Sequence, residues 1–267
     1  MSSSRITRIV LWLVVTPFFT CHAVADEKAT QDESARQGRD FLVQLIDKEI
    51  DLLPEFRGHH VYWLYHDNYL VTKVLEQTHP AAATRISKAI EKYGEDHSGK
   101  IEILFGESKS NLPFRHFDLV EVARDDQRVI RTERATEREM NGWEAYADLR
   151  LLAAIALAEE DKKQAIQNFD AALKMWNKED QGLADAVLKT RKIYATYKLA
   201  LTVIAAERLG QLERLPTGLV KRLRKMQHAS GGWITDYHPD GNPVGKANVE
   251  TTCLAILALD CLTTHRR

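Results

Sequence analysis

The chain has 267 residues, of which 28% are charged and 44% are hydrophobic. This composition excludes a disordered tail and a bundle of membrane-spanning helices. The 37 Lys and Arg residues stand against 38 Asp and Glu residues, which gives a formal charge of -1. The chain therefore has no excess of positive charge that would indicate a nucleic-acid partner.

A cleaved secretory signal is predicted over residues 1–25. Arg5 and Arg8 precede an apolar run over 9–19, and small residues follow at Ala23 and Ala25. This order is typical of a secretory signal, and the run is shorter than the ~20 residues that span a bilayer. We therefore expect a secreted or periplasmic protein with no stable membrane span after cleavage. A signal that is kept as an N-terminal anchor is the alternative.

The cysteines do not predict a disulfide. Cleavage after Ala25 removes Cys21 and leaves Cys253 and Cys261, which are eight residues apart in one predicted helix. That spacing is ~12 Å along a helix axis, whereas a disulfide needs Cα atoms within ~7 Å. We expect two buried free thiols.

The first part of the mature chain is predicted to be helical, with a β insertion. A polar, flexible leader over 26–36 precedes apolar residues at helical spacing over 37–53, 68–75 and 81–93. Between about 100 and 134, β-branched or aromatic residues alternate with polar ones over 101–105, 117–122 and 128–132. This pattern predicts a small antiparallel sheet inserted into a single domain over 37–267.

Two kinds of predicted helix alternate in the rest of the chain. The segments 149–158, 199–206 and 254–262 are apolar almost all round, whereas 164–176 and 215–227 carry charge on one face. Each apolar helix, and that at 68–75, has a possible capping residue at its start: Asn68, Asp148, Thr196 and Thr251. These starts recur roughly every 45–55 residues once the insertion is left out, which predicts an array of helical hairpins.

One motif is more specific. Leu223, Gln227, Gly231 and Trp233 fit Leu-x3-Gln-x3-Gly-x-Trp, followed by a loop and an apolar helix. This resembles the Gln-Trp repeat of the α/α-toroid superfamily, the group with terpene cyclases and protein prenyltransferase β-subunits, whose helical-hairpin architecture is shared with six-hairpin glycosidases. The resemblance implies a mainly α fold: an incomplete α/α toroid of helical hairpins with a small antiparallel β insertion. In such motifs the tryptophan packs on the following repeat.

The candidate site residues follow from this architecture. If the apolar helices all begin at one end of a ring, their first residues meet at one mouth, where carboxyl groups can divide acid and base roles and flat rings can stack on sugars. The candidate catalytic residues are Asp67, Glu144, Asp236 and Glu250. The candidate substrate-binding residues are Tyr65, His66, Asn68, Trp143, Tyr146, Asp148, Tyr194, Tyr197, Lys198, Trp233 and Asn248. Helix caps and core packing are the simpler interpretation for several of them, Asn68, Asp148 and Tyr194 included.

The expected function is that of an exported protein whose mouth binds a glycan. If it is an enzyme, it is a glycoside hydrolase or a polysaccharide lyase-like enzyme. The alternative is a non-catalytic scaffold that binds an envelope protein. A third function, isoprenoid handling, is disfavoured because the cyclases' Asp-x-Asp-Asp motif and a convincing zinc trio are absent from the sequence. No phosphate-binding loop, nucleophile elbow or zinc motif occurs, so neither a cofactor nor a metal is predicted.

Overall fold

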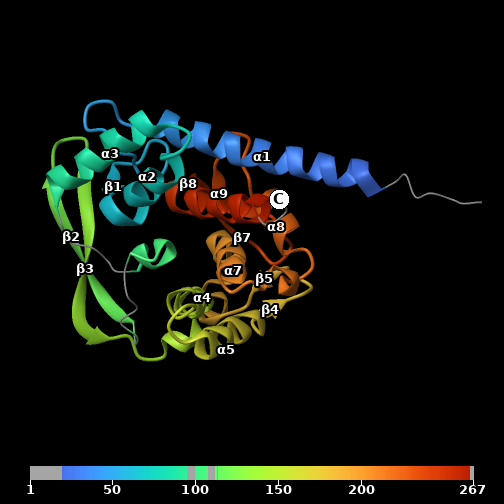
Figure 1. The fold of residues 1–267 in the computed structure, drawn as a ribbon. Helices are drawn as coiled ribbons and strands as arrows, with labels where there is room; N and C mark the ends of the chain where they lie inside the picture. Colours follow the sequence, from blue (N-terminus) through green and yellow to red (C-terminus); the bar gives the residue numbers. More distant parts are fainter. Residues whose placement is uncertain (1–19, 95–99, 108–111, 113, 265–267) are drawn as a thin grey trace, which may run out of the picture.

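The structure is a computed structural model that describes residues 20–94, 100–107, 112 and 114–264 (Figure 1). Residues 1–19, which make up most of the predicted signal, lie outside the described residues. None of the helices in the described part of the chain is both long enough and apolar enough to cross a membrane.

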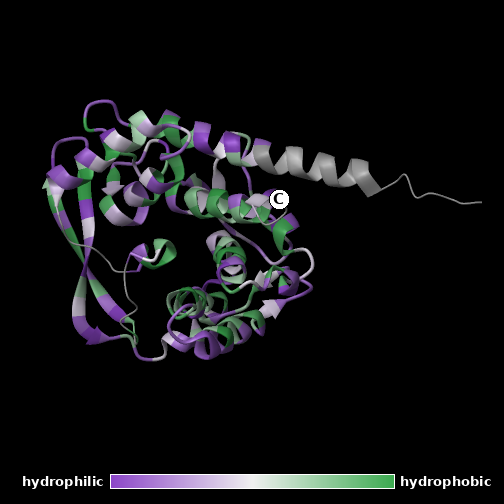
Figure 2. Cartoon of the chain, viewed as in Figure 1, coloured by the Kyte–Doolittle hydropathy of each residue, from purple (hydrophilic) through white to green (hydrophobic). Residues whose placement is uncertain are grey.

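Four helices form the centre of the molecule: α2 (Leu70–Leu75), α4 (Ala147–Ala156), α7 (Thr196–Arg208) and α9 (Val249–Thr264). In the order α4, α7, α9 and α2, each of them packs against the next. Most side chains of α4, α7 and α9 are buried, and Figure 2 shows these helices as largely hydrophobic. Helices that are covered on every side must be apolar on every side, which explains why their sequences lack a polar face.

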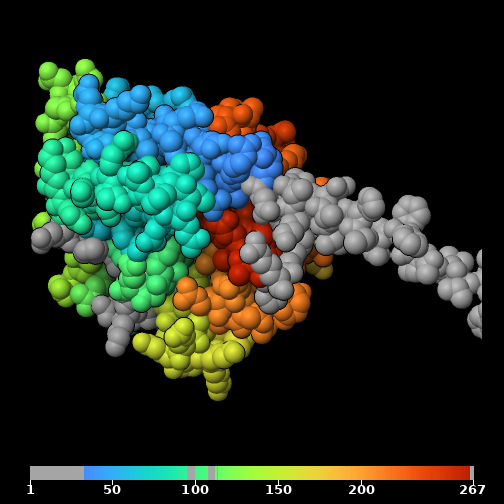
Figure 3. Space-filling model, turned by 45° about the horizontal axis from the view of Figure 1, so that its top comes forward, coloured from blue at the N-terminus to red at the C-terminus, as the bar shows by residue number. Residues whose placement is uncertain are grey.

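An outer helix packs on each central helix. α5 (Lys162–Leu173) packs on α4, α8 (Leu219–Lys225) on α7, α1 (Thr20–Leu45) on α9, and α3 (Pro80–Tyr93) on α2. In Figure 3 the blue segment of α1 lies against the red C-terminal helix, so the first and last helices of the described chain pack together. The shorter helices are η1 (Leu64–Tyr69), η2 (Glu102–Phe105), η3 (Trp143–Ala145), α6 (Ala186–Arg191) and η4 (Leu212–Arg214).

The strands form three small sheets. The first has the order β1-β3-β2, built from β1 (Val61–Trp63), β2 (Arg115–Arg124) and β3 (Val129–Glu139). β1 runs parallel to β3, with Val61 opposite Val129, and β2 runs antiparallel to β3. The second sheet pairs β4 (Trp176–Asn177) with β5 (Gly182–Leu183), and the third has the order β6 (Tyr194–Ala195), β7 (Trp233–Tyr237) and β8 (Pro243–Asn248).

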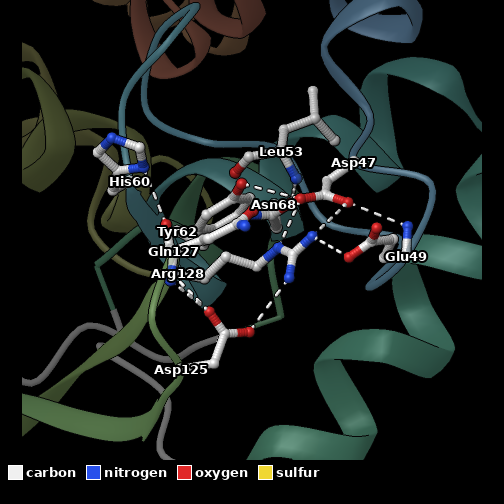
Figure 4. A network of polar contacts seen from close by, with 9 residues as sticks. All are labelled: Asp47, Glu49, Leu53, His60, Tyr62, Asn68, Asp125, Gln127 and Arg128. Atoms are coloured by element: carbon white, nitrogen blue, oxygen red, sulfur yellow. Dashed lines mark hydrogen bonds and ion pairs between the residues drawn. The ribbon is translucent and has the colours of Figure 1, made fainter.

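A network around Arg128 fastens the β2–β3 hairpin to the body (Figure 4). The Arg128 Nε atom donates to Asp47 Oδ2 at 2.7 Å, and its Nη1 atom lies 3.1 Å from Asp125 Oδ2. Arg128 also pairs with Glu49, and the Tyr62 hydroxyl donates to Asp47 at 3.0 Å. The start of β3 is thereby tied to the loop that follows α1.

The predicted fold class is wrong. The chain was expected to be mainly α, an incomplete α/α toroid of helical hairpins, whereas the structure is mixed α/β with 51% helix, 19% strand and three small sheets. Two of these sheets arise from segments that carry no recognisable alternation, since all five of their strands are only two to six residues long.

Several elements also differ locally from their prediction. Residues 101–105 were expected to form a strand, but η2 forms there. Residues 26–36, the predicted flexible leader, lie within α1. The helix expected over 215–227 is limited to α8, because η4 and a turn precede it. Cys253 and Cys261 are free, as expected, but only Cys253 is buried, and Cys261 is partly exposed.

Candidate functional site

His66 lies between two carboxyl groups from distant parts of the chain. Because β1 pairs with β3, the chain leaves this sheet at Trp63 and turns directly into η1, which packs against both β3 and α9. His66 Nδ1 lies 3.2 Å from Glu133 Oε2 on β3, and His66 Nε2 lies 3.1 Å from Glu250 Oε1 in the first turn of α9. Three separate elements thus meet at one imidazole.

This arrangement makes His66 a cation at neutral pH. Burial by itself would lower the pKa of His66, but the Glu250 and Glu133 carboxylates outweigh it and raise the pKa to about 10. Burial would likewise raise the pKa of Glu133, yet the hydrogen bond and charge of His66 leave this pKa below its ordinary value. An imidazolium between two carboxylates is the resulting state.

Asp67 follows His66 in η1 and is only 2% exposed. Burial raises the pKa of Asp67 well above its ordinary value, and the nearby Glu250 raises it further, against the opposing charge of His66, so its surroundings favour the protonated form of this carboxyl group. Burial, with Asp67 and Glu250 as further causes, also raises the pKa of Cys253, one turn further along α9. Asp67 therefore lies beside the first turn of α9. We call His66, Asp67, Glu133 and Glu250 the His66 cluster.

A second polar group adjoins it at the starts of α4 and α7. The Tyr197 hydroxyl donates to Asp148 Oδ2 at 2.8 Å, and Lys198 Nζ lies 3.5 Å from Asp148 Oδ1. Lys198 also pairs with the buried Asp185. Burial raises the pKa of Tyr197, as do Asp148 and then Glu250. We call Asp148, Asp185, Tyr197 and Lys198 the Lys198 cluster. Because Glu250 contributes to the raised pKa of Tyr197, this cluster lies next to the His66 cluster.

Asp236 adjoins the Lys198 cluster from the third sheet. It lies on β7, where its register partner is Ala195, two residues before Tyr197. Burial raises the pKa of Asp236, against the opposing effects of the Thr235 hydroxyl and of the Arg191 and Lys198 charges. Of the four predicted catalytic residues, Asp67, Glu250 and Asp236 thus lie at or beside the two clusters.

Glu144 is the predicted catalytic residue that stands apart. It lies in η3 with an exposed side chain, and its backbone carbonyl, not its carboxylate, accepts a hydrogen bond from Arg150 Nε at 2.9 Å. Its neighbour Trp143 packs edge-on against Phe114 with 5.2 Å between ring centroids. Tyr146, half-buried, precedes α4. This part of the predicted mouth has no contact with the His66 cluster among the interactions of the described residues.

Several predicted binding residues have structural partners instead. Asn68 is buried, and its side chain bonds the backbone of Leu53 and Trp63. Trp233 is fully buried and donates from Nε1 to the Leu223 carbonyl at 2.9 Å. The remaining three are Tyr65, which donates to the Gly94 carbonyl, Tyr194, which donates to Asp180, and Asn248, which accepts from Thr251 N at the start of α9.

Three of the central helices lack the side-chain caps that the sequence predicts. No side chain caps α2, α4 or α7 at its N-cap position. Asp185 takes over this role in part, because its Oδ2 atom accepts from Ala147 N at 3.0 Å and its Oδ1 atom accepts from Val187 N at 2.9 Å. Asp148 therefore has no capping role, and its carboxyl group contacts Tyr197 and Lys198 instead.

Sequence reasoning missed two residues, Glu133 and Asp185. Glu133 lies in a strand where charged residues surround it on both sides, so nothing in the local pattern sets it apart. Asp185 caps α6, a helix of six residues that is too short to show periodicity. Only the pairing of β1 with β3, a long-range feature, brings Glu133 to His66.

The two clusters hold polar atoms without a hydrogen bond. Among the described residues, the buried side-chain atoms that lack good hydrogen-bond geometry include His66 Nδ1, Asp67 Oδ2, Glu133 Oε2 and Asp148 Oδ1. Of these, His66 Nδ1 and Glu133 Oε2 face each other as an ion pair at 3.2 Å, and Asp148 Oδ1 lies 3.5 Å from Lys198 Nζ. The side chains of His66, Glu250 and Asp148 nevertheless remain about one-fifth exposed, at 19%, 22% and 20%. The site thus combines a buried Asp67 oxygen that makes no hydrogen bond with ion pairs that solvent partly reaches. No group of three potential metal ligands occurs in the part of the chain that was described.

Comparison with known proteins gives no relative. No protein-family model matches the chain, and no match was found among curated proteins or solved structures.

Proposed function

We propose that the chain is an exported protein that binds a glycan at the His66 and Lys198 clusters and cleaves it by carboxyl acid/base chemistry. The observation that carries this proposal is that the pKa values of two neighbouring carboxyl groups are shifted in opposite directions. The pKa of Asp67 is raised by burial and by Glu250, whereas the pKa of Glu133 is lowered by His66 despite burial. Paired carboxyl groups with separated pKa values are the usual basis for dividing acid and base roles.

Each carboxyl group then has a distinct role. Glu250 is the one in this cluster with the most exposed side chain, at 22% against 14% for Glu133, so it meets the substrate. Asp67 is buried and holds the proton that Glu250 takes up and delivers to the glycosidic oxygen. The bond from the sugar carbon to that oxygen breaks, water adds to the carbon, and the proton of the water returns to the carboxyl pair. Glu133 and His66 fix the position of Glu250.

The proposal of export rests on the sequence pattern over residues 1–25. Mass spectrometry of the protein isolated from its native compartment tests it, with Asp26 expected as the first residue. A chain that retains residues 1–25 would contradict cleavage.

The functional test uses the mature chain and a panel of soluble polysaccharides, with binding and the release of reducing ends as readouts. We expect Glu250→Gln and Asp67→Asn each to lower the rate about 100-fold or more, because each removes a transferable proton. Glu144→Gln is the matched control, since this glutamate is exposed and stands apart from the clusters. No binding to any glycan, or an unchanged rate in Glu250→Gln, would overturn the proposal.

One observation favours a second function, a protein-binding scaffold. Lys198 is buried and is held by both Asp148 and Asp185, an arrangement that also fits a purely structural role. In that case the protein binds an envelope protein and cleaves nothing. Cross-linking in intact cells would then recover a partner whose capture is unaffected by Glu250→Gln.

A further inference from the structure

We propose that a cavity outside the two clusters binds a carboxylate that is carried on a compact apolar body, such as a single aromatic ring. The cavity holds about 240 Å³ and lies between the loop after α1, the loop after α8 and β8. Arg57, His228 and Lys246 come from these three segments in turn. None of the lining residues belongs to the His66 or Lys198 cluster, so this inference goes beyond the proposed function and does not depend on it.

The inner wall of this cavity is apolar. Phe41 is 1% exposed and Ile234 is 9% exposed, and Phe56 and Ala247 line the cavity beside them. An engineered apolar cavity of ~150 Å³ binds benzene, so a cavity of about 240 Å³ has room for one ring and a small polar substituent. Most of this wall offers no partner for the hydroxyl groups of a sugar, which favours an apolar body.

The charged groups that line the cavity are cationic. Arg57 and Lys246 are exposed, and among the residues that the structure describes none with a carboxyl group lines the cavity. Arg57 Nη2 donates to Gln44 Oε1 at 3.5 Å, and Lys246 Nζ lies 4.4 Å from the centroid of the Phe56 ring. Neither cation forms an ion pair within the described ranges of the chain. Two cations without a counter-charge at an apolar cavity favour an anionic ligand.

His228 adds a hydrogen-bond donor to these cations. Its Nδ1 atom accepts from Ser230 N at 3.1 Å and lies 2.9 Å from Ser230 Oγ. A ring nitrogen that accepts an N–H carries no proton, so the neutral imidazole has its proton on Nε2. The lining thus offers the guanidinium of Arg57, the ammonium of Lys246 and an imidazole N–H. A carboxylate only accepts hydrogen bonds and matches this set, whereas a zwitterionic amino acid would place its own ammonium among cations.

The walls of the cavity are held in place before any ligand binds. At Gly231, where φ is +96°, a Cβ atom would lie 2.3 Å from the Gln37 carbonyl oxygen, so the loop after α8 lies directly on α1. On the other side, Val249 N donates to the Glu55 carbonyl at 3.0 Å, which ties the loop after α1 to the end of β8. A preformed site loses less conformational entropy on binding, so a small ligand can bind it.

The test compares phenylacetate, phenylacetamide and acetate by calorimetric titration of the unaltered chain at pH 7 and low salt. Phenylacetate should bind about 10-fold or more tightly than phenylacetamide, which has the same ring without the charge. It should also bind more tightly than acetate, which has the charge without the ring. Added salt should weaken the preference over the amide, because the cations are exposed. Equal binding of phenylacetate and phenylacetamide, or no binding of phenylacetate, would overturn the inference.

Variants that remove one charge locate the site. Arg57→Gln and Lys246→Gln should each lower the affinity for phenylacetate several-fold and leave that for phenylacetamide unchanged. Both side chains are exposed, as is Lys163 on α5, so Lys163→Gln is the matched control and should retain the preference. A preference for phenylacetate that survives both cavity variants would place the carboxylate elsewhere and overturn the inference. The comparison of ligands on the unaltered chain needs no variant to fold, and none of its outcomes bears on glycan cleavage.

Discussion

The Nε2 atom of His66 lies 3.1 Å from Oε1 of Glu250. This contact joins the segment before α2 to the first turn of α9, the last helix of the described chain. A carboxylate in the first turn of a helix is also stabilised by the partial positive charge of that end. The Glu250 side chain is therefore held in place by the His66 imidazole and by the start of α9 together.

Stability should fall as the pH rises above neutral. The folded chain holds the His66 proton up to a pKa of about 10, whereas an unfolded histidine loses it near its ordinary value of ~6.5. Above that value the unfolded state binds fewer protons, so the free energy of unfolding decreases with pH. Urea denaturation between pH 7 and 9.5 checks this. His66→Gln should flatten the dependence, and an equal slope in the variant would contradict the assignment.

Asp67→Asn should make the protein more stable at pH 7 relative to the unaltered chain, even though it removes the proposed acid. Burial and Glu250 raise the pKa of Asp67 on folding, so an ionised Asp67 opposes folding at pH 7, and asparagine avoids that cost. The difference in free energy of unfolding between the two proteins should shrink as the pH approaches 4. A variant less stable at pH 7 than at pH 4, relative to the unaltered chain, would argue that Asp67 is ionised.

The helices were predictable to different degrees. α7 and α9 cover the expected apolar segments 199–206 and 254–262. These helices were predictable because a helix that is buried on every side has an almost entirely apolar sequence. The sheet of β6, β7 and β8 was not predictable, since its strands are short and its middle strand is buried at Trp233 and Tyr237 as if it were core. The toroid prediction failed on these strands.

The site was predictable only where it depends on helix starts. Asp67 and Glu250 were found because each lies at the start of an apolar segment, and the packing of α2 against α9 brings these starts together. Glu133 was not, because strand pairing far along the chain decides its position. Asn68 was predicted as a binding residue, and its amide bonds the Leu53 backbone; the local sequence pattern is the same for either role.

Arg128→Gln should loosen the β2–β3 hairpin and destabilise the protein by about 1–3 kcal/mol, because the Arg128 side chain is only 13% exposed and bonds several carboxylates. The pKa of His66 should fall with it, since Glu133 follows five residues later on β3. Arg124→Gln on the same hairpin is the control. Its ion pair with Glu121 is exposed, so stability should stay unchanged. Equal effects of both variants would contradict the role of Arg128.

Trp233→Phe should cost about 1–3 kcal/mol of stability, because it removes the buried hydrogen bond to the Leu223 carbonyl and leaves a space in the core. Glycan binding should persist in the folded variant, since this ring is fully buried in the core. Thermal unfolding and binding measured on the same sample separate the two effects. Trp143→Phe is the comparison, with a half-buried ring and little expected change in stability. Selective loss of binding in Trp233→Phe would instead make Trp233 a sugar platform.

The titration of His66 by nuclear magnetic resonance is the most direct test of the assembly on which the site depends. With His66→Gln used to assign the signal, the imidazole of the unaltered protein should remain protonated through pH 8 and titrate near the value of about 10 set by Glu250 and Glu133. Glu133→Gln should move this midpoint toward neutrality. A midpoint near ~6.5 in the unaltered protein, the ordinary value for histidine, would show that the two carboxylates do not enclose His66.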